Sequence, residues 1–163
     1  RIHMKGKKLI VYDIECLPNF FCVVYGELEG DRVFTYEISE HNQEHAAIIQ
    51  IAELYQLIGY NSHGYDDVLI KYIMLNPTCT NAELYEISRA IIDRDFFVTK
   101  KYKQDKSMQS IDIMTMLASS KLRVSLKHLQ VVIKWHNVPG ESISLSWTPL
   151  MQTYQLNQYK YQT

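Results

Sequence analysis

The first forty residues alternate apolar and polar positions in a pattern that predicts three β-strands. Residues 9–16 form an apolar, β-favouring run without a turn former, which is typical of a buried strand. A turn at Pro18-Asn19 leads to a second run at 20–26, and turn residues at 29–32 lead to a third at 33–38. Because these connections are short, we expect an antiparallel meander.

Beyond residue 40 the apolar residues recur every three to four positions, which predicts helices. Residues 41–55 fit an amphipathic helix that crosses the sheet, and the apolar run 57–60 fits a fourth strand beside the first. The later elements are predicted as a helix over 65–76, a helix over 81–91 capped by Thr80 or Asn81, a loop over 93–107, a strand over 110–114 leading into a helical turn, and a helix from 125 to about 137. We therefore expect an α/β fold whose mixed sheet is flanked by helices.

The first strand ends with two carboxylates, Asp13 and Glu15. Residues two positions apart in a strand project from the same face, so these side chains lie together. Two neighbouring acids repel each other, and such a pair is tolerated mainly where a cation compensates. Carboxylate oxygens suit hard divalent ions such as Mg²⁺. The alternative is that the pair merely marks an exposed strand end.

A third acid, Asp66, follows the predicted fourth strand. If that strand lies beside the first, Asp66 arrives near Asp13 and Glu15, and the three acids converge. Two divalent ions held there would support in-line attack of water on a phosphodiester. The alternative is that Asp66 and Asp67 are ordinary first-turn acids, favoured by the helix dipole.

Residues 100–106 carry four lysines and one aspartate, with aromatic residues close by. Basic and aromatic side chains together suit a single strand of nucleic acid, through phosphate pairing and base stacking. A solvated charged loop is the alternative. If the segment binds nucleic acid, Lys100, Lys101 and Lys103 are the candidate contacts.

The length, composition and charge of the chain limit the classes of protein to which it can belong. A chain of 163 residues with 47% hydrophobic residues and a net charge of -1 fits one globular domain, so any nucleic-acid contact must be local. Three cysteines without metal-ligand spacing suggest neither a zinc site nor a disulfide framework, and favour a reducing, cytoplasmic compartment. No apolar run is long enough for a membrane, and no signal peptide is recognisable. We interpret residues 1–3 as an expression remnant and 4–163 as the domain.

Two segments carry a resemblance to a known family. Residues 11–15, Val-Tyr-Asp-Ile-Glu, resemble the first exonuclease motif of the proofreading 3′-5′ exonuclease domains of family B and bacteriophage-type DNA polymerases, within the DEDD superfamily. Residues 59–66 are similar to the second motif, in which an Asn and a short spacer precede an aromatic residue and an Asp. The element order fits the ribonuclease-H-like fold of that family, and residues 111–113 resemble a strand found between its second and third motifs. The likeness covers residues 8 to about 139.

The resemblance implies a role for each matching residue. Asp13 and Glu15 would ligate two Mg²⁺ or Mn²⁺ ions, and Asp66 would hold the second ion. Asn61 would contact the substrate strand, and Tyr65, also a candidate contact, would chiefly pack the motif in place.

Two neighbours of these residues match no functional position of the family. We therefore expect His63 and Asp67 to be surface or loop residues.

The family's third motif, a Tyr followed four positions later by an Asp, is absent from the sequence. No Asp follows Asp112, and Thr163 stands four positions after Tyr159. Either the sequence stops short of the fourth carboxylate, as we expect, or the protein naturally lacks it. The resemblance thus implies an exonuclease domain from a protein with a polymerase domain, which acts on single-stranded DNA or a primer 3′ end and not on membranes. A non-catalytic nucleic-acid-binding module, an RNA-directed exonuclease and a purely structural α/β domain are the alternatives.

Overall fold

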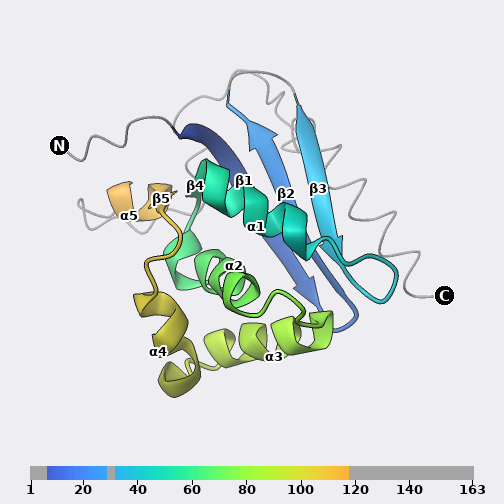
Figure 1. The fold of residues 1–163 in the computed structure, drawn as a ribbon. Helices are drawn as coiled ribbons and strands as arrows, with labels where there is room; N and C mark the ends of the chain where they lie inside the picture. Colours follow the sequence, from blue (N-terminus) through green and yellow to red (C-terminus); the bar gives the residue numbers. More distant parts are fainter. Residues whose placement is uncertain (1–6, 29–31, 118–163) are drawn as a thin grey trace, which may run out of the picture. The chain divides into compact units, whose positions relative to one another are not determined.

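The structure is a computed structural model that describes residues 7–28 and 32–117. These residues form an α/β fold, in which helices flank a five-stranded mixed sheet (Figure 1). The elements are β1 (Lys8–Leu17), β2 (Phe20–Glu27), β3 (Val33–Ile38), α1 (His45–Leu54), β4 (Tyr55–Gly59), the short 3-10 helix η1 (Ser62–Gly64), α2 (Asp66–Leu75), α3 (Asn81–Ile92), α4 (Phe96–Gln104), β5 (Ser110–Asp112) and α5 (Ile113–Leu117).

The sheet has the strand order β3-β2-β1-β4-β5. Strands β1, β2 and β3 pair antiparallel, which confirms the predicted meander. Strand β4 lies beside β1, as predicted, and pairs parallel with it, and β5 pairs parallel with β4. The β1–β4 pairing stops at Val11 and Ile58, whereas β1 continues to Leu17 beside β2. The second half of β1 therefore extends past the end of β4.

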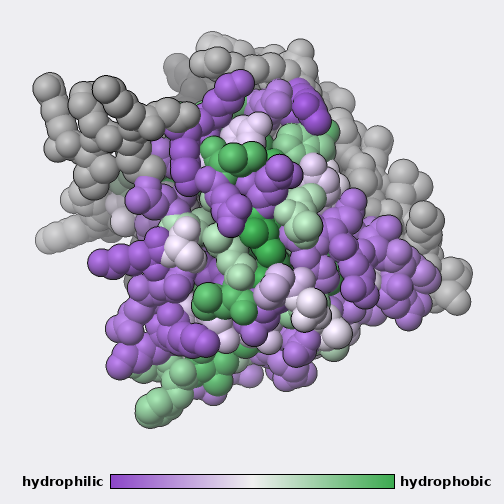
Figure 2. All heavy atoms as spheres, viewed as in Figure 1, coloured by the Kyte–Doolittle hydropathy of each residue, from purple (hydrophilic) through white to green (hydrophobic). Residues whose placement is uncertain are grey.

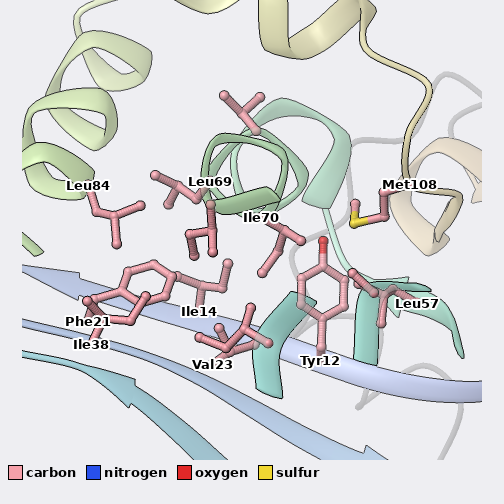
Figure 3. Packing of buried hydrophobic residues seen from close by; sticks show 14 of the residues in the cluster. Tyr12, Ile14, Phe21, Val23, Ile38, Leu57, Leu69, Ile70, Leu84 and Met108 are labelled. Atoms are coloured by element: carbon pink, nitrogen blue, oxygen red, sulfur yellow. The ribbon is translucent and has the colours of Figure 1, made fainter. Parts of the chain in front are cut away.

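The core lies between the sheet and the helices. Ile10, Tyr12 and Ile14 alternate along β1 with more exposed residues, and they are buried against Leu69 and Ile70 of α2. Figure 3 shows the Tyr12 ring standing on the sheet, with its hydroxyl pointing toward α2. The opposite face of β1 carries the residues between these three, including Asp13.

The prediction of a loop over 93–107 is wrong, because α4 occupies most of it. The Asp95 side chain caps this helix by accepting a hydrogen bond from the backbone N–H of Val98 at 3.2 Å. The Tyr102 ring packs edge-on against Tyr72 of α2, with ring centroids 5.3 Å apart. Thr99 is the one residue of α4 that is fully buried. Because so few positions of α4 face the core, its sequence lacks the apolar spacing by which an amphipathic helix is recognised.

The boundaries of other elements differ little from those predicted. Helix α1 begins at His45 rather than at residue 41, after a turn in which the Ser39 N–H donates to the Asn42 carbonyl. Helix α3 begins after a capping box in which Thr80 and Glu83 exchange hydrogen bonds, as the choice of cap predicted. The predicted helix from 125, the candidate third-motif positions and most of the C-terminal third of the expected domain lie outside the described residues.

Figure 2 shows one face of the molecule. Hydrophilic residues cover most of it, and hydrophobic ones gather near the centre, where α1 and α2 lie. In residues 7–28 and 32–117, no helix is both long and apolar enough to cross a membrane.

Candidate active site

Asp13 and Glu15 lie in the part of β1 that extends past β4. Alternation along the strand turns Ile14 into the core and both acids to the other face. Asp13 is exposed and Glu15 is half-buried. The predicted pairing of the two carboxylates on one face is thus confirmed by the burial pattern of the strand.

The chain turns sharply after β4, next to this part of β1. Gly59 permits the turn, because a Cβ there would lie 2.4 Å from the Ser62 Cβ and 3.0 Å from a ring carbon of Tyr12. Asn61 takes a left-handed backbone conformation with φ 56°, which Asn tolerates better than most residues. Helix α2 then starts at Asp66, so the turn places that acid near the sheet.

A buried carboxylate from β5 holds this turn in place. Asp112 accepts hydrogen bonds from the backbone N–H groups of Asn61 at 2.8 Å and His63 at 3.1 Å. It also accepts one from the Met114 N–H at 3.0 Å, and only 3% of Asp112 is exposed. The sequence predicts a strand at Asp112 but does not reveal this function. The only signal is an acid within an otherwise apolar run.

The pKa of Asp66 links it to its acidic neighbours. Burial, followed by the negative charge of Asp13, raises the pKa of Asp66 to about 8, and Asp67 and Asp112 contribute further. Burial and then Asp13 also raise the pKa of Glu15. The pKa of Asp13 is itself raised, because surrounding atoms partly desolvate a carboxylate that still has exposed surface.

Asp13 is therefore close enough to both Glu15 and Asp66 for mutual repulsion. Each of the three predicted acids thus interacts electrostatically with at least one of the others. Over the described residues, however, no three His, Cys, Asp or Glu side chains are grouped closely enough to hold a metal ion.

Asp67 is not the surface residue that the sequence analysis expected. Only 3% of it is exposed, and its two carboxylate oxygens accept hydrogen bonds from the hydroxyls of Tyr12 and Ser110. The His63 ring lies 3.7 Å from it and is exposed, as expected. The prediction failed because α2 turns this side chain toward the sheet, where two hydroxyls from distant strands meet it.

Tyr65 supports α2 from its N-terminal end. Its ring is half-buried against the core, and its hydroxyl forms a 2.6 Å hydrogen bond with the hydroxyl of Ser88 in α3. This contact agrees with the packing role that the resemblance implied.

The candidate lysines lie on α4. The Lys100 ammonium is 5.7 Å from the centre of the Phe96 ring, and the Lys101 ammonium is 5.5 Å from that of Tyr102. Beside them, 93% of Phe97 is exposed. Lys103 instead lines a pocket between α4 and α2. In the part of the chain that the structure describes, no ion pair joins these lysines to the acids at the end of β1.

Comparisons of the chain with protein-family models, with curated proteins and with solved structures find no match. The chemistry of this chain must therefore be inferred from its own residues. Three features are relevant: the acids at the end of β1, the turn that Asp112 holds, and the basic and aromatic surface of α4.

Proposed function

We propose that this chain is a metal-dependent 3′-5′ exonuclease domain with a ribonuclease-H-like fold, which hydrolyses single-stranded DNA as the proofreading part of a phage-type polymerase. The observation that carries the proposal is the position of Asp13, whose charge raises the pKa of both Glu15 and Asp66. This electrostatic interaction between acids of β1 and α2, the elements that carry the two motifs of the resemblance, supports the proposal.

The order of the elements supports the fold assigned in this proposal. Three antiparallel strands, a helix, a parallel strand and a motif turn before the next helix follow one another as the resemblance implied. The turn also lies at the carboxyl end of β4 beside β1, which is where ligands bind in open α/β sheets.

The donor chemistry fits a hard divalent ion, because Asp13, Glu15 and Asp66 offer only carboxylate oxygens. A bound Mg²⁺ or Mn²⁺ would activate water and neutralise the charge that develops on the leaving oxygen. The carboxylates must come closer together than they lie in this structure, since no three of the described metal-ligating side chains are grouped for one ion. In this proposal, metal binding draws the Asp13 carboxylate toward the other two.

Other residues would bind and orient the strand. Asn61 is exposed on the turn, and the hydrogen bonds that the backbone N–H groups of Asn61 and His63 donate to Asp112 fix the backbone there. Phe97 and the lysines of α4 offer an aromatic surface and cations for bases and phosphates. In this proposal Asp112 is a positioning residue that acts through the turn.

The test is hydrolysis of a 5′-labelled single-stranded DNA with Mg²⁺ or Mn²⁺, by this chain and by a version extended past Thr163. We expect shortening from the 3′ end, and a loss of about 100-fold or more in Asp13→Asn and in Asp66→Asn, because each variant removes a charged metal ligand. Asp93→Asn, at an exposed acid that ends α3, is the matched control. Activity that survives Asp13→Asn, or no activity from either version, would refute the proposal.

The second candidate is a non-catalytic module that keeps the fold and binds a nucleic-acid strand. The spacing of the described acids, no three of which are grouped for one ion, favours it. The two candidates differ in their response to Mg²⁺, because bound metal stabilises a folded protein by mass action. DNA binding without a rise in melting temperature on adding Mg²⁺ would select the module. A matched RNA strand in the same assays separates DNA from RNA preference.

A further inference from the structure

A second polar site lies on the helix side of the sheet, separate from the acids at the end of β1. It is an open pocket of about 900 Å³, bounded by α2, α4 and the segment before β5. Figure 1 shows these elements next to one another, and α2 and α4 are in contact. The volume is within the range of ligand pockets, roughly 300 to 1,000 Å³.

Lys71 of α2 lines this pocket although only 9% of the residue is exposed. A lysine this deeply buried is normally paired with a carboxylate, because an uncompensated buried charge is costly. Among the described residues, no carboxylate lies within the 4.0 Å of an ion pair with Lys71. Its ammonium therefore has room for an anion from outside the chain.

The two acids that line the pocket have other hydrogen-bond partners. Asp67 accepts hydrogen bonds from the hydroxyls of Tyr12 and Ser110. Asp105 accepts hydrogen bonds from the backbone N–H of Ser107, at 2.9 Å, and from its hydroxyl. The hydrogen bonds from Ser107 lower the pKa of Asp105, and the positive charges of Lys71 and Lys101 lower it further. Asp105 therefore offsets part of the Lys71 charge without forming an ion pair with it.

Two further cations line the same pocket, Lys103 at the end of α4 and Lys106 just after it. Both are exposed, so they surround the opening while Lys71 is set deeper. Lysine ammonium groups bind phosphate as point charges, with short charge-assisted hydrogen bonds. Gln56, Gln109 and Ser110 add neutral polar groups to the lining.

We propose that this pocket binds a phosphate group, with Lys71 as its main contact and Lys103 and Lys106 as supporting cations. The phosphate belongs to inorganic phosphate, to a mononucleotide or to a nucleic-acid strand. The proposal does not depend on the nuclease activity, because these lysines are separate from Asp13, Glu15 and Asp66.

The experiment measures binding in EDTA, where no metal-dependent hydrolysis occurs, at constant ionic strength. Inorganic phosphate, dAMP and a short oligo-dT are titrated separately, and both the dissociation constant and the melting temperature are recorded. We expect Lys71→Met to weaken binding by about tenfold or more, because a hydrogen bond between charged groups is lost. Lys106→Met, at an exposed position where folding is not at risk, should weaken binding less. Lys8→Met, at an exposed lysine outside this pocket, is the matched control.

Lys71→Met should leave the melting temperature of the ligand-free protein unchanged or raise it, because no ion pair among the described residues is lost. A lysine with a purely structural role would lower that temperature when replaced and leave binding unchanged. Equal affinities for the three ligands identify phosphate alone as the recognised group, while tighter binding of dAMP or of oligo-dT identifies the larger source. Binding unchanged in both pocket variants, or weakened equally in Lys8→Met, would overturn the proposal.

Discussion

At the scale of single residues, the contribution of a buried polar group to stability depends on whether it has a hydrogen-bond partner. Tyr12 and Tyr25 face each other across β1 and β2, and both are buried. The Tyr12 hydroxyl donates to Asp67, whereas the Tyr25 hydroxyl has no hydrogen-bond partner among the described residues. Two buried tyrosines on adjacent strands thus differ in whether their hydroxyl is hydrogen-bonded within the described residues.

The two tyrosines allow a matched substitution. Tyr12→Phe leaves the buried carboxylate of Asp67 with one donor fewer, and we expect it to lower the free energy of unfolding by about 1–3 kcal/mol. Tyr25→Phe breaks no hydrogen bond of the described residues, so its effect should stay within about 0.5 kcal/mol or be stabilising. Urea unfolding of both variants measures the difference. Equal losses would contradict the assigned partners.

The raised pKa of Asp66 predicts how stability changes with pH. Its pKa is about 8 in the folded protein, against about 4 in an unfolded chain. The folded state therefore holds this proton more tightly, and the resulting stabilisation is complete below about pH 4 and lost as pH rises through about 8. The free energy of unfolding, measured with urea in EDTA, should fall from pH 5 to pH 8.

Asp66→Asn is the variant that checks this assignment. It removes the titrating group, so the fall in stability between pH 5 and pH 8 should become shallower. Part of the fall should remain, because the pKa values of Asp13 and Glu15 are also raised. A pH profile identical to that of the wild type would mean that Asp66 does not titrate in this range.

At the scale of elements, α3 and α4 show when a helix is recognisable in the sequence. Helix α3 has a capping box at Thr80 and Glu83, and its buried residues recur at helical spacing. Helix α4 has a cap at Asp95 but buries a single residue completely. Apart from Tyr102, which is half-buried against Tyr72, its other side chains, including Phe97, face solvent, so its sequence pattern is typical of a loop. In the proposed function these exposed side chains contact the strand.

Helix α4 is expected to bind single strands partly by stacking. Phe97→Ala should weaken oligo-dT binding by about tenfold, because stacking a base on an aromatic ring contributes about 1–3 kcal/mol. Stability should not change, since 93% of Phe97 is exposed. Leu54→Ala, at an exposed apolar residue ending α1, is the control. Fluorescence anisotropy measures both, and equal effects would exclude a specific role for Phe97.

At the scale of the whole molecule, net charge limits how the chain would bind a nucleic-acid strand in the proposed function. The net charge is -1, so attraction to phosphates must come from local groups of lysines. Acids concentrate instead at the end of β1, where they repel a polyanion unless a cation neutralises them. The proposed function therefore requires one group of residues for binding the strand and another for hydrolysing it.

The dependence of strand binding on salt measures the size of the basic region. If Lys100, Lys101 and Lys103 each contact one phosphate, the logarithm of the binding constant should fall with the logarithm of salt concentration with a slope of about -2. Titrations of oligo-dT at several salt concentrations give this slope. A slope steeper than about -5 would require many more phosphate contacts than α4 provides.

The sequence by itself determined the features that depend on near neighbours along the chain. Strand and helix periods, the cap at Thr80, and the common face of Asp13 and Glu15 follow from backbone geometry over a few residues. The position of β4 beside β1 also followed, because a crossover helix between strands restricts the topology.

Only the tertiary structure decided which polar groups meet across the fold. Asp112 reaches the turn at Asn61 over 51 residues of sequence, and Asp67 meets Tyr12 over 55. The open pocket with Lys71 likewise exists only because α4 packs beside α2. The physical reason is that a local pattern fixes which face of an element is apolar, whereas partners on that face depend on how the elements pack together.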